Sequence, residues 1–427
     1  MDGYIIEAAH TISPFQDPVS ACRVEDRPLS EWVERTLRDL GCDAVRPAPN
    51  TIQGPALVMT GDLWITRDLA TAFLKEARSK TTPTVLAARQ GLMTSYTEVL
   101  QDLGECDVDG EGSRVYPLAW VPAGASLEVG GGDLALEWEA LGLTPLAVEL
   151  DEDPMELPVH RVFAAEQKLV LPFTHRSAVR IGHWMHVLRA NQMARIGWGA
   201  RLVRVEWLKL LWAAMRAMSF NKWRVMAKLT TRGAGCDIHP TAVVEGSVLG
   251  DNVTVGAGAI VRFSWLGDGA RVSDSSHVLY SVLGAGASTA RMGMLQSCVL
   301  YPGANSGHYG LQLCVVGRDT FVGGEVVLGD FKPDGNIMVM HRGELKNTHT
   351  NLLGCAVGHD CSVMMRATTY AGREIPNGYT IIGPPHDIIT KIPDGLPRDG
   401  TPLIADGGVL VPYSKARHKR RAPGEEG

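Results

Sequence analysis

The chain has 427 residues, of which 45% are hydrophobic and 21% are charged, with a formal net charge of −6. This composition is typical of a globular protein of two or three domains and excludes a disordered chain. Nothing in the overall charge indicates a nucleic-acid partner. Eight cysteines are scattered without a CxxC pair, and the chain starts without a basic segment and a long apolar run. We therefore expect a cytoplasmic protein with reduced thiols.

Residues 1 to about 180 alternate strand-like runs, such as GPALVMTG and PTVLAAR, with helix-like runs, such as PLSEWVERTLRDLG and TRDLATAFLKEARSK. Such alternation predicts a Rossmann-like α/β domain with a largely parallel sheet. In order, the stretches EAAHTISPFQDP, RPLSEWVERTLRDLG and GPALVMTGD resemble the first motifs of the sugar-1-phosphate nucleotidylyltransferases. The helix and the Gly61-Asp62 pair match that family well, whereas the phosphate loop does not.

A phosphate loop needs glycines, whose backbone N–H groups approach the triphosphate, and cationic side chains that offset its charge. Here the loop reads AAHTISPFQDP, with no glycine, arginine or lysine. His10 and Thr11 are poor substitutes. The resemblance makes Asp62 the candidate metal ligand, with Mg²⁺ needed only if this site is active, but a carboxylate after a strand is equally a helix N-cap. We expect this domain to have lost nucleotidyl transfer.

Residues 183 to 232 are predicted to form a helical arm, with no proline and many Leu, Met, Arg and Lys. This segment contains ten basic residues and a single acidic residue, so the arm has a net charge of +9 and the rest of the chain has −15. On one continuous helical wheel, five of the cations fall within an arc of roughly 140°. Tryptophan with Lys and Arg is typical of an interfacial helix on anionic lipid. The alternative is that the arm packs between the domains and its arginines contact an acidic partner surface, the N-terminal domain. The basic residues are Arg189, Arg195, Arg201, Arg204, Lys209, Arg216, Lys222, Arg224, Lys228 and Arg232.

From about residue 236 to 395 an aliphatic residue recurs every six residues and is often followed by glycine. The pairs Leu249-Gly250 and Val255-Gly256 share one phase, which slips and resumes at Leu266-Gly267 and later at Val316-Gly317. Neither a helical nor a strand period explains this spacing. It is the hexapeptide signature of a left-handed parallel β-helix, and such coils usually trimerise. We therefore predict a homotrimer.

Both halves together resemble the bifunctional N-acetylglucosamine-1-phosphate uridylyltransferases/glucosamine-1-phosphate acetyltransferases, down to the linker-like HWMHVLRANQMARIGW. The stretch ANSGHYGLQLCVVGRD aligns with their acetyltransferase motif, although one residue is missing after the histidine. The resemblance implies an acetyl-CoA or other acyl-CoA co-substrate and a small sugar-phosphate acceptor. It implies that His308 is the base, with Asn305 and Asp330 holding the substrate or the imidazole. Asp330 stands where that family has an asparagine.

The segment from Asp330 to Cys361 is predicted to project from the β-helix and to rejoin it near Leu353-Gly354. Its Lys332, Arg342 and Lys346 are candidates for binding a CoA phosphate, although such cations are more often only solvated. A zinc site like that of the γ-class carbonic anhydrases is the less favoured alternative. It would draw on His308, His341, His349 and His359, whose intervals do not match that class. These candidate ligands are the four histidines of the stretch from residue 308 to 359.

Residues 396 to 427 are predicted to form a poorly ordered tail with a second basic cluster, KARHKRR (Lys415 to Arg421). Three functions remain open from the sequence. The first is an acyl-CoA-dependent acyltransferase acting on an amino sugar or sugar phosphate. The second is a non-catalytic scaffold or regulatory subunit, cytoplasmic or peripheral to a membrane. The third is a residual sugar-1-phosphate nucleotidylyltransferase.

Overall fold

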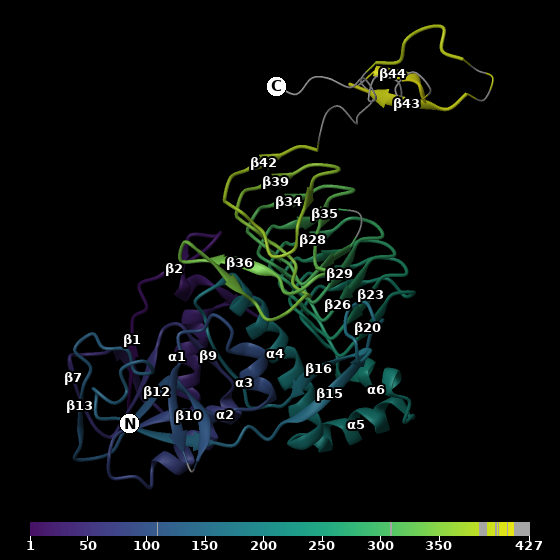
Figure 1. Cartoon of the computed structure of the whole chain (residues 1–427). Coiled ribbons are helices and arrows are strands. Elements are labelled where there is room, and N and C mark those ends of the chain that lie inside the picture. The colour runs from purple at the N-terminus through teal and green to yellow at the C-terminus, as the bar shows by residue number, and fades with distance from the viewer. Residues whose placement is uncertain are drawn as a thin grey trace, which may run out of the picture.

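In the computed structural model, the described residues are 1–108, 110–307, 310–383, 391–397, 399, 401–407 and 409–413. An N-terminal α/β domain lies beside a long stack of parallel strands, and three helices connect the two (Figure 1). No helix in the described part of the chain is long and apolar enough to cross a membrane. All eight cysteines are free thiols, and most are buried, as the sequence predicts.

The N-terminal sheet has seven strands, in the order β14-β10-β12-β8-β1-β6, with β11 paired to β12. The prediction of a largely parallel sheet is only half right. The pairs β1–β6, β1–β8 and β10–β14 are parallel, but β12 runs antiparallel to all its neighbours. The reason is that β11 and β12 form a hairpin, which turns the chain back into the middle of the sheet. The strands are β1 (Asp2–Ile6), β6 (Ala44–Pro47), β8 (Ala56–Thr60), β10 (Thr84–Arg89), β11 (Gly104–Val108), β12 (Glu111–Val121) and β14 (Thr144–Val148).

The predicted helices of this domain are confirmed as α1 (Leu29–Asp39) and α2 (Arg67–Ala77), and a short α3 (Leu92–Thr97) follows. In α1, Leu29, Val33 and Leu37 are buried at helical spacing, so one face of the helix packs into the domain core. Two-stranded pairings complete the domain: β2 (Thr11–Ile12) with β3 (Asp17–Pro18), β4 (Arg23–Val24) with β5 (Arg27–Pro28), β7 (Thr51–Gln53) with β13 (Ser126–Glu128), β9 (Leu63–Ile65) with β17 (Ala178–Arg180), and β15 (Asp153–Pro158) with β16 (Lys168–Phe173). A single 3-10 turn, η1 (Val19–Ala21), lies between β3 and β4.

The arm consists of three helices, α4 (Trp184–Arg204), α5 (Trp207–Ala217) and α6 (Lys222–Leu229). Its helical character is as predicted, but the single continuous wheel is wrong. Helix α5 ends because Met218 adopts a left-handed conformation, and α6 starts afresh where the Asn221 side chain accepts a hydrogen bond from the Trp223 backbone N–H at 3.0 Å. The directions of the basic side chains must therefore be read helix by helix.

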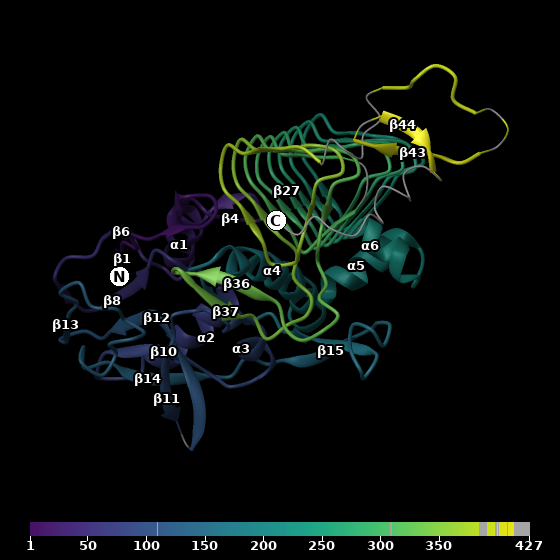
Figure 2. The ribbon, with the colours of Figure 1, turned by 45° about the horizontal axis from the view of Figure 1, so that its top comes forward.

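The C-terminal region is a parallel β-helix with three faces, which Figure 2 shows as loops stacked in register. Val248, Trp265, Val282 and Val299 are direct neighbours on one face, so each coil takes 17 residues. Within a coil the first two steps are six residues long and the third is five, as in Val248, Thr254, Ile260 and Trp265. The short third step explains why the hexapeptide phase slips. Handedness stays a prediction from the repeat.

The first face holds β18 (Thr231–Arg232), β21 (Val248–Leu249), β24 (Trp265–Leu266), β27 (Val282–Leu283), β30 (Val299–Leu300), β33 (Val315–Val316), β38 (Ala356–Val357) and β41 (Glu374–Ile375). The second holds β19 (Asp237–Ile238), β22 (Thr254–Val255), β25 (Arg271–Val272), β28 (Ser288–Thr289), β31 (Asn305–Ser306), β34 (Phe321–Val322), β39 (Ser362–Val363) and β42 (Thr380–Ile381). The third holds β20 (Val243–Glu245), β23 (Ile260–Arg262), β26 (His277–Leu279), β29 (Met294–Gln296) and β32 (Gly310–Gln312), with β35 (Val327–Leu328) and β40 (Thr368–Thr369) as a separate pair.

The predicted projection from the β-helix is confirmed. The chain leaves the coil at Asp330, forms the hairpin β36 (Met338–His341) and β37 (Glu344–Asn347), and returns at Leu353, whose backbone N–H donates to the Asp330 carbonyl at 2.9 Å. Figure 2 shows this hairpin reaching from the β-helix over α4 toward the N-terminal domain. A last hairpin, β43 (Leu403–Asp406) with β44 (Val409–Pro412), lies in the predicted tail. The KARHKRR cluster lies outside the described residues.

Candidate functional site

The loop that the sequence comparison aligns with a phosphate loop packs against the β-helix. Phe15 in this loop is buried, and its ring stacks on Tyr301 with the ring centroids 5.3 Å apart. The Asn377 side chain, from the far end of the β-helix, donates to the Phe15 carbonyl at 2.7 Å. The loop therefore serves as a contact between the two domains.

Asp17 continues this contact with a charged group. Its carboxylate accepts a hydrogen bond from His359 Nε2 at 2.9 Å and another from the Arg318 guanidinium at 3.2 Å. The Arg318 backbone N–H donates to His359 Nδ1 at 2.7 Å, so the proton of the neutral ring lies on Nε2. Burial opposes ionisation of Asp17, but Arg318 and His359 outweigh it and hold the pKa of this carboxyl below its usual value. Burial lowers the pKa of His359.

A second contact between the domains lies at Asp26. Its carboxylate accepts a hydrogen bond from the backbone N–H of Ala285, on a corner of the β-helix, at 3.0 Å. The neighbouring Arg23 donates its backbone N–H to the Tyr301 hydroxyl at 3.2 Å. The residues from Ser13 to Asp26 are thus bound along several coils, and their acidic side chains are used to hold the two domains together.

A third contact lies beneath the β36–β37 hairpin. His183 Nε2 is 3.1 Å from the Met340 carbonyl oxygen and 3.3 Å from Oε1 of Glu374. The other carboxylate oxygen of Glu374, Oε2, accepts a hydrogen bond from the Ser13 hydroxyl. Arg342, at the tip of the hairpin, forms an ion pair with Asp102 of the N-terminal domain. This cation, predicted to bind a CoA phosphate, is therefore used within the protein.

The other two candidate CoA ligands are also held by the projecting segment itself. Lys332 Nζ donates to the Asn336 carbonyl at 3.1 Å, and Lys346 pairs with Glu344 on the solvent side of the hairpin. The structure brings neither of them to the edge of the β-helix where His308 was predicted to act. Their proposed role in phosphate binding stays a prediction.

Asp62, the candidate metal ligand, is buried and fully engaged. Its Oδ1 accepts from the Thr60 hydroxyl at 2.5 Å, and its Oδ2 accepts from Arg180 Nε at 2.8 Å. Arg180 also binds Asp133, and although burial opposes its charge, the two carboxylates raise its pKa above the usual value. No group of three or more metal-ligating side chains gathers anywhere in the described ranges. The positive charge of Arg180 beside the Asp62 carboxylate does not suit a bound Mg²⁺ ion. The assignment of Asp62 as a metal ligand stays a prediction.

His308, the predicted base, lies outside the described residues. Thr289 pairs with Ser306, and Met294 pairs with Gly310. Three residues therefore separate Ser306 from Gly310, one fewer than the four that separate Thr289 from Met294 in the coil before. The role of His308 as a base stays a prediction.

Asn305 and Asp330 are not brought together within one chain. Asn305 is on the second face, where its amide donates to the Ser288 hydroxyl at 2.8 Å. Asp330 follows β35 of the third face, where the chain leaves the coil toward the projecting segment. It is half-buried, and burial raises the pKa of its carboxyl. The histidines of the zinc alternative are likewise separate: His359 binds Asp17, whereas His341 lies against His183.

Several exposed apolar side chains lie on the β-helix near this part of the chain. Met292 is 70% exposed on the corner between β28 and β29, and Met365 is 58% exposed on the corner between β39 and β40, three coils further along. Met294 and Phe321 are also exposed on strands of the β-helix. Exposed apolar residues that gather on one side of a protein are typical of a surface that another molecule covers.

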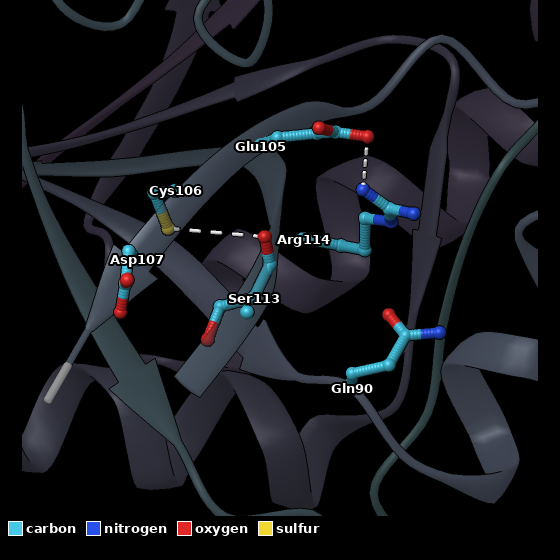
Figure 3. A pocket seen from close by; sticks show the side chains of 7 residues that line it. Gln90, Glu105, Cys106, Asp107, Ser113 and Arg114 are labelled. Atoms are coloured by element: carbon cyan, nitrogen blue, oxygen red, sulfur yellow. Dashed lines mark hydrogen bonds and ion pairs between the residues drawn. The ribbon is translucent and has the colours of Figure 1, made fainter. Parts of the chain in front are cut away.

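A cavity with a volume of about 480 Å³ lies beside the β11–β12 hairpin. Figure 3 shows Glu105, Asp107, Gln90 and Arg114 around it. Arg114 is already bound by Glu98 and Glu105. The acidic lining does not suit a phosphate-bearing ligand, so this cavity is not a candidate nucleotide or CoA site.

Sequence reasoning missed the roles of Asp17, His359 and Glu374, because their partners are hundreds of residues away in the chain. The one signal in the sequence for this domain contact is that the loop of residues 8–18 has no glycine, arginine or lysine. Neither the scan against protein-family models nor the search of curated proteins finds a match to this chain.

Proposed function

We propose that the protein is an acyl-CoA-dependent acyltransferase that acts on an amino sugar or sugar phosphate, and that its N-terminal domain is a non-catalytic platform. The observation that carries this proposal concerns the residues from Ser13 to Asp26, which include part of the loop that resembles a phosphate loop. They contact the β-helix through Phe15, Asp17 and Asp26. This contact leaves catalysis to the β-helix. The stacked parallel strands and the resemblance of the stretch around His308 to an acetyltransferase motif support acyl transfer there.

In the proposed reaction, His308 takes a proton from the acceptor amine as its nitrogen attacks the thioester carbonyl. The C–N bond forms, the C–S bond breaks, and CoA leaves as a thiolate that regains the proton. A neutral imidazole is the appropriate base for this step near neutral pH.

We further propose that the site is completed by a neighbouring copy in a trimer. Within one chain, Asn305 and Asp330 lie at separate places on the coil. A neighbouring β-helix would cover exposed apolar side chains such as those of Met292 and Met365. A second copy would then bring its own polar residues to the proposed site.

The test is acetyl-CoA turnover against a panel of amino sugars and amino-sugar phosphates. His308→Ala should lower the rate at least a hundredfold, whereas His349→Ala, at an exposed histidine on the projecting segment, should not. Equal background rates for the wild-type protein and His308→Ala would overturn the proposal. They would favour the scaffold alternative, which the same loop contacts support.

Residual nucleotidylyl transfer stays a prediction that can be tested separately. Nucleotide binding measured with and without Mg²⁺ decides it. Metal-dependent binding that is lost in Asp62→Asn, in a variant that is still folded, would restore this function.

A further inference from the structure

Helix α5 has its side chains arranged opposite to those of an ordinary surface helix. Its buried or half-buried positions are Leu210 and three small residues, Ala213, Ala214 and Ala217. Its other large apolar residues are exposed to solvent, and two more follow in the turn after it. We call these residues the α5 face: Trp207, Leu208, Leu211, Trp212, Met215, Met218 and Phe220.

The α5 face is continuous. At about 100° per residue, its five helical members cover an arc of roughly 140° on one side of the helix. Trp212 is 60% exposed, and Met218 and Phe220 are more than 90% exposed. Figure 1 shows α5 and α6 together at the β20 end of the β-helix, far from the last coil strand β42. No described residue of this chain covers the face.

Eight of the ten cations of the arm fall into two groups; of the other two, Arg189 lies over the Tyr96 ring and Lys209 pairs with Glu206. In α4, Arg195 pairs with Glu25, Arg201 with Asp68, and Arg204 with Asp153. This half confirms the expectation that the arginines contact the acidic N-terminal domain. In the C-terminal half the arrangement differs: Arg216, Lys222, Arg224, Lys228 and Arg232 form no ion pair within the described residues, and all five are exposed.

Cations flank the apolar residues on both helices. On α5, Arg216 and Lys209 lie directly beside the edge of the face, in helical order after Trp212. On α6, Lys222 Nζ lies 4.7 Å from the centre of the Trp223 ring. The only acidic residue of the arm, Glu206, is bound by Arg201 and Lys209. Among the arm's own residues, cations therefore outnumber this single carboxylate beside the face.

We propose that the α5 face binds the surface of an anionic lipid bilayer, with α5 lying in the plane of the membrane. Trp, Leu, Met and Phe would enter the boundary between headgroups and acyl chains, while the flanking Lys and Arg side chains reach the anionic headgroups. A two-fold contact with a second copy is less favourable, since it would bring the same unpaired cations against one another. This inference goes beyond acyl transfer and does not rest on it.

Flotation of the full-length protein with vesicles tests the proposal, comparing phosphatidylcholine alone with phosphatidylcholine and phosphatidylserine. We expect binding to the anionic vesicles, weaker at high salt. The variant Arg216→Gln/Lys222→Gln/Arg224→Gln should bind roughly a hundredfold more weakly. The variant Leu208→Ser/Trp212→Ser should lose binding.

Two matched controls are available. Lys75→Gln/Lys80→Gln removes exposed cations from the region of α2, and Tyr370→Ser/Tyr379→Ser removes exposed aromatic residues near the last coils. Both should bind like the wild-type protein. Absence of binding at low salt, or equal losses in the controls, would overturn the proposal. So would a fall in solution mass for Leu208→Ser/Trp212→Ser without vesicle binding by the wild-type protein, because the occupant would then be a second copy.

Discussion

Asp17 of the N-terminal loop and His359 of the β-helix, 342 residues apart in the chain, share a hydrogen bond of 2.9 Å at the domain contact. The ring of Phe15 lies against the same imidazole, with the ring centroids 5.1 Å apart. The charge of Asp17 is thus balanced by groups of the β-helix, including the Arg318 guanidinium.

Removing the Asp17 charge should loosen the two domains. Asp17→Asn leaves Arg318 without its carboxylate and should lower the free energy of unfolding by about 2 kcal/mol, discounted from buried-pair values because the site is partly solvated. Chemical denaturation of Asp17→Asn, His359→Ala and the double variant measures the coupling. Additive losses would show that the hydrogen bond does not stabilise the contact.

His186 should make the protein sensitive to acid. Its Nε2–H donates to the Val99 carbonyl at 2.8 Å, while its Nδ1 accepts from the Gly182 backbone N–H at 2.9 Å, so the folded protein holds a neutral ring. Burial lowers its pKa to about 3. Because the unfolded chain binds the proton more readily, stability should fall as the pH drops from about 6.5 toward the folded pKa, by about 1.4 kcal/mol per pH unit for this group.

Denaturation midpoints of His186→Gln between pH 7 and pH 4 should show a shallower decline than those of the wild-type protein. His349→Gln, at an exposed position, is the control and should follow the wild-type curve. Parallel curves for all three proteins would exclude His186 as the source of the acid sensitivity.

Asp62→Ala should act on stability rather than on metal binding. The change leaves the buried Arg180 paired only with Asp133, and losing one partner of a buried pair costs about 3 kcal/mol. Thermal unfolding of the wild-type protein should show no Mg²⁺-dependent shift of the Tm. Glu34→Ala, which breaks an exposed pair with Arg38, should change the stability by less than about 1 kcal/mol.

Arg342→Ala separates a structural role from CoA binding. If Arg342 only joins the hairpin to Asp102, the loss should be below about 1 kcal/mol and should shrink at high salt, because the pair is exposed. In that case the KM for acyl-CoA would not change. A raised KM with unchanged stability would instead support the predicted phosphate contact.

The sequence determined those features that depend on local spacing. Aliphatic residues such as Leu249, Leu266 and Leu283 must all face inward, so their recurrence predicted the β-helix. The slip in the six-residue phase follows from the 17-residue length of each coil. Helix α1 and the existence of a segment that projects from the β-helix followed from equally local patterns, whereas the hairpin within that segment did not. The antiparallel β12 did not, since strand direction depends on which distant strands pair.

Only the tertiary structure decided what the candidate groups contact. Asp62 meets Arg180 across 118 residues, and Asp17 meets His359 across 342, so no motif around either residue indicates its partner. The sequence showed that the arm is helical, basic and rich in tryptophan, but not where its helices end or which side of each faces water. Packing decided that: the small side of the helix, with Ala213, fits against the protein, and the side with Trp207 and Trp212 remains in solvent.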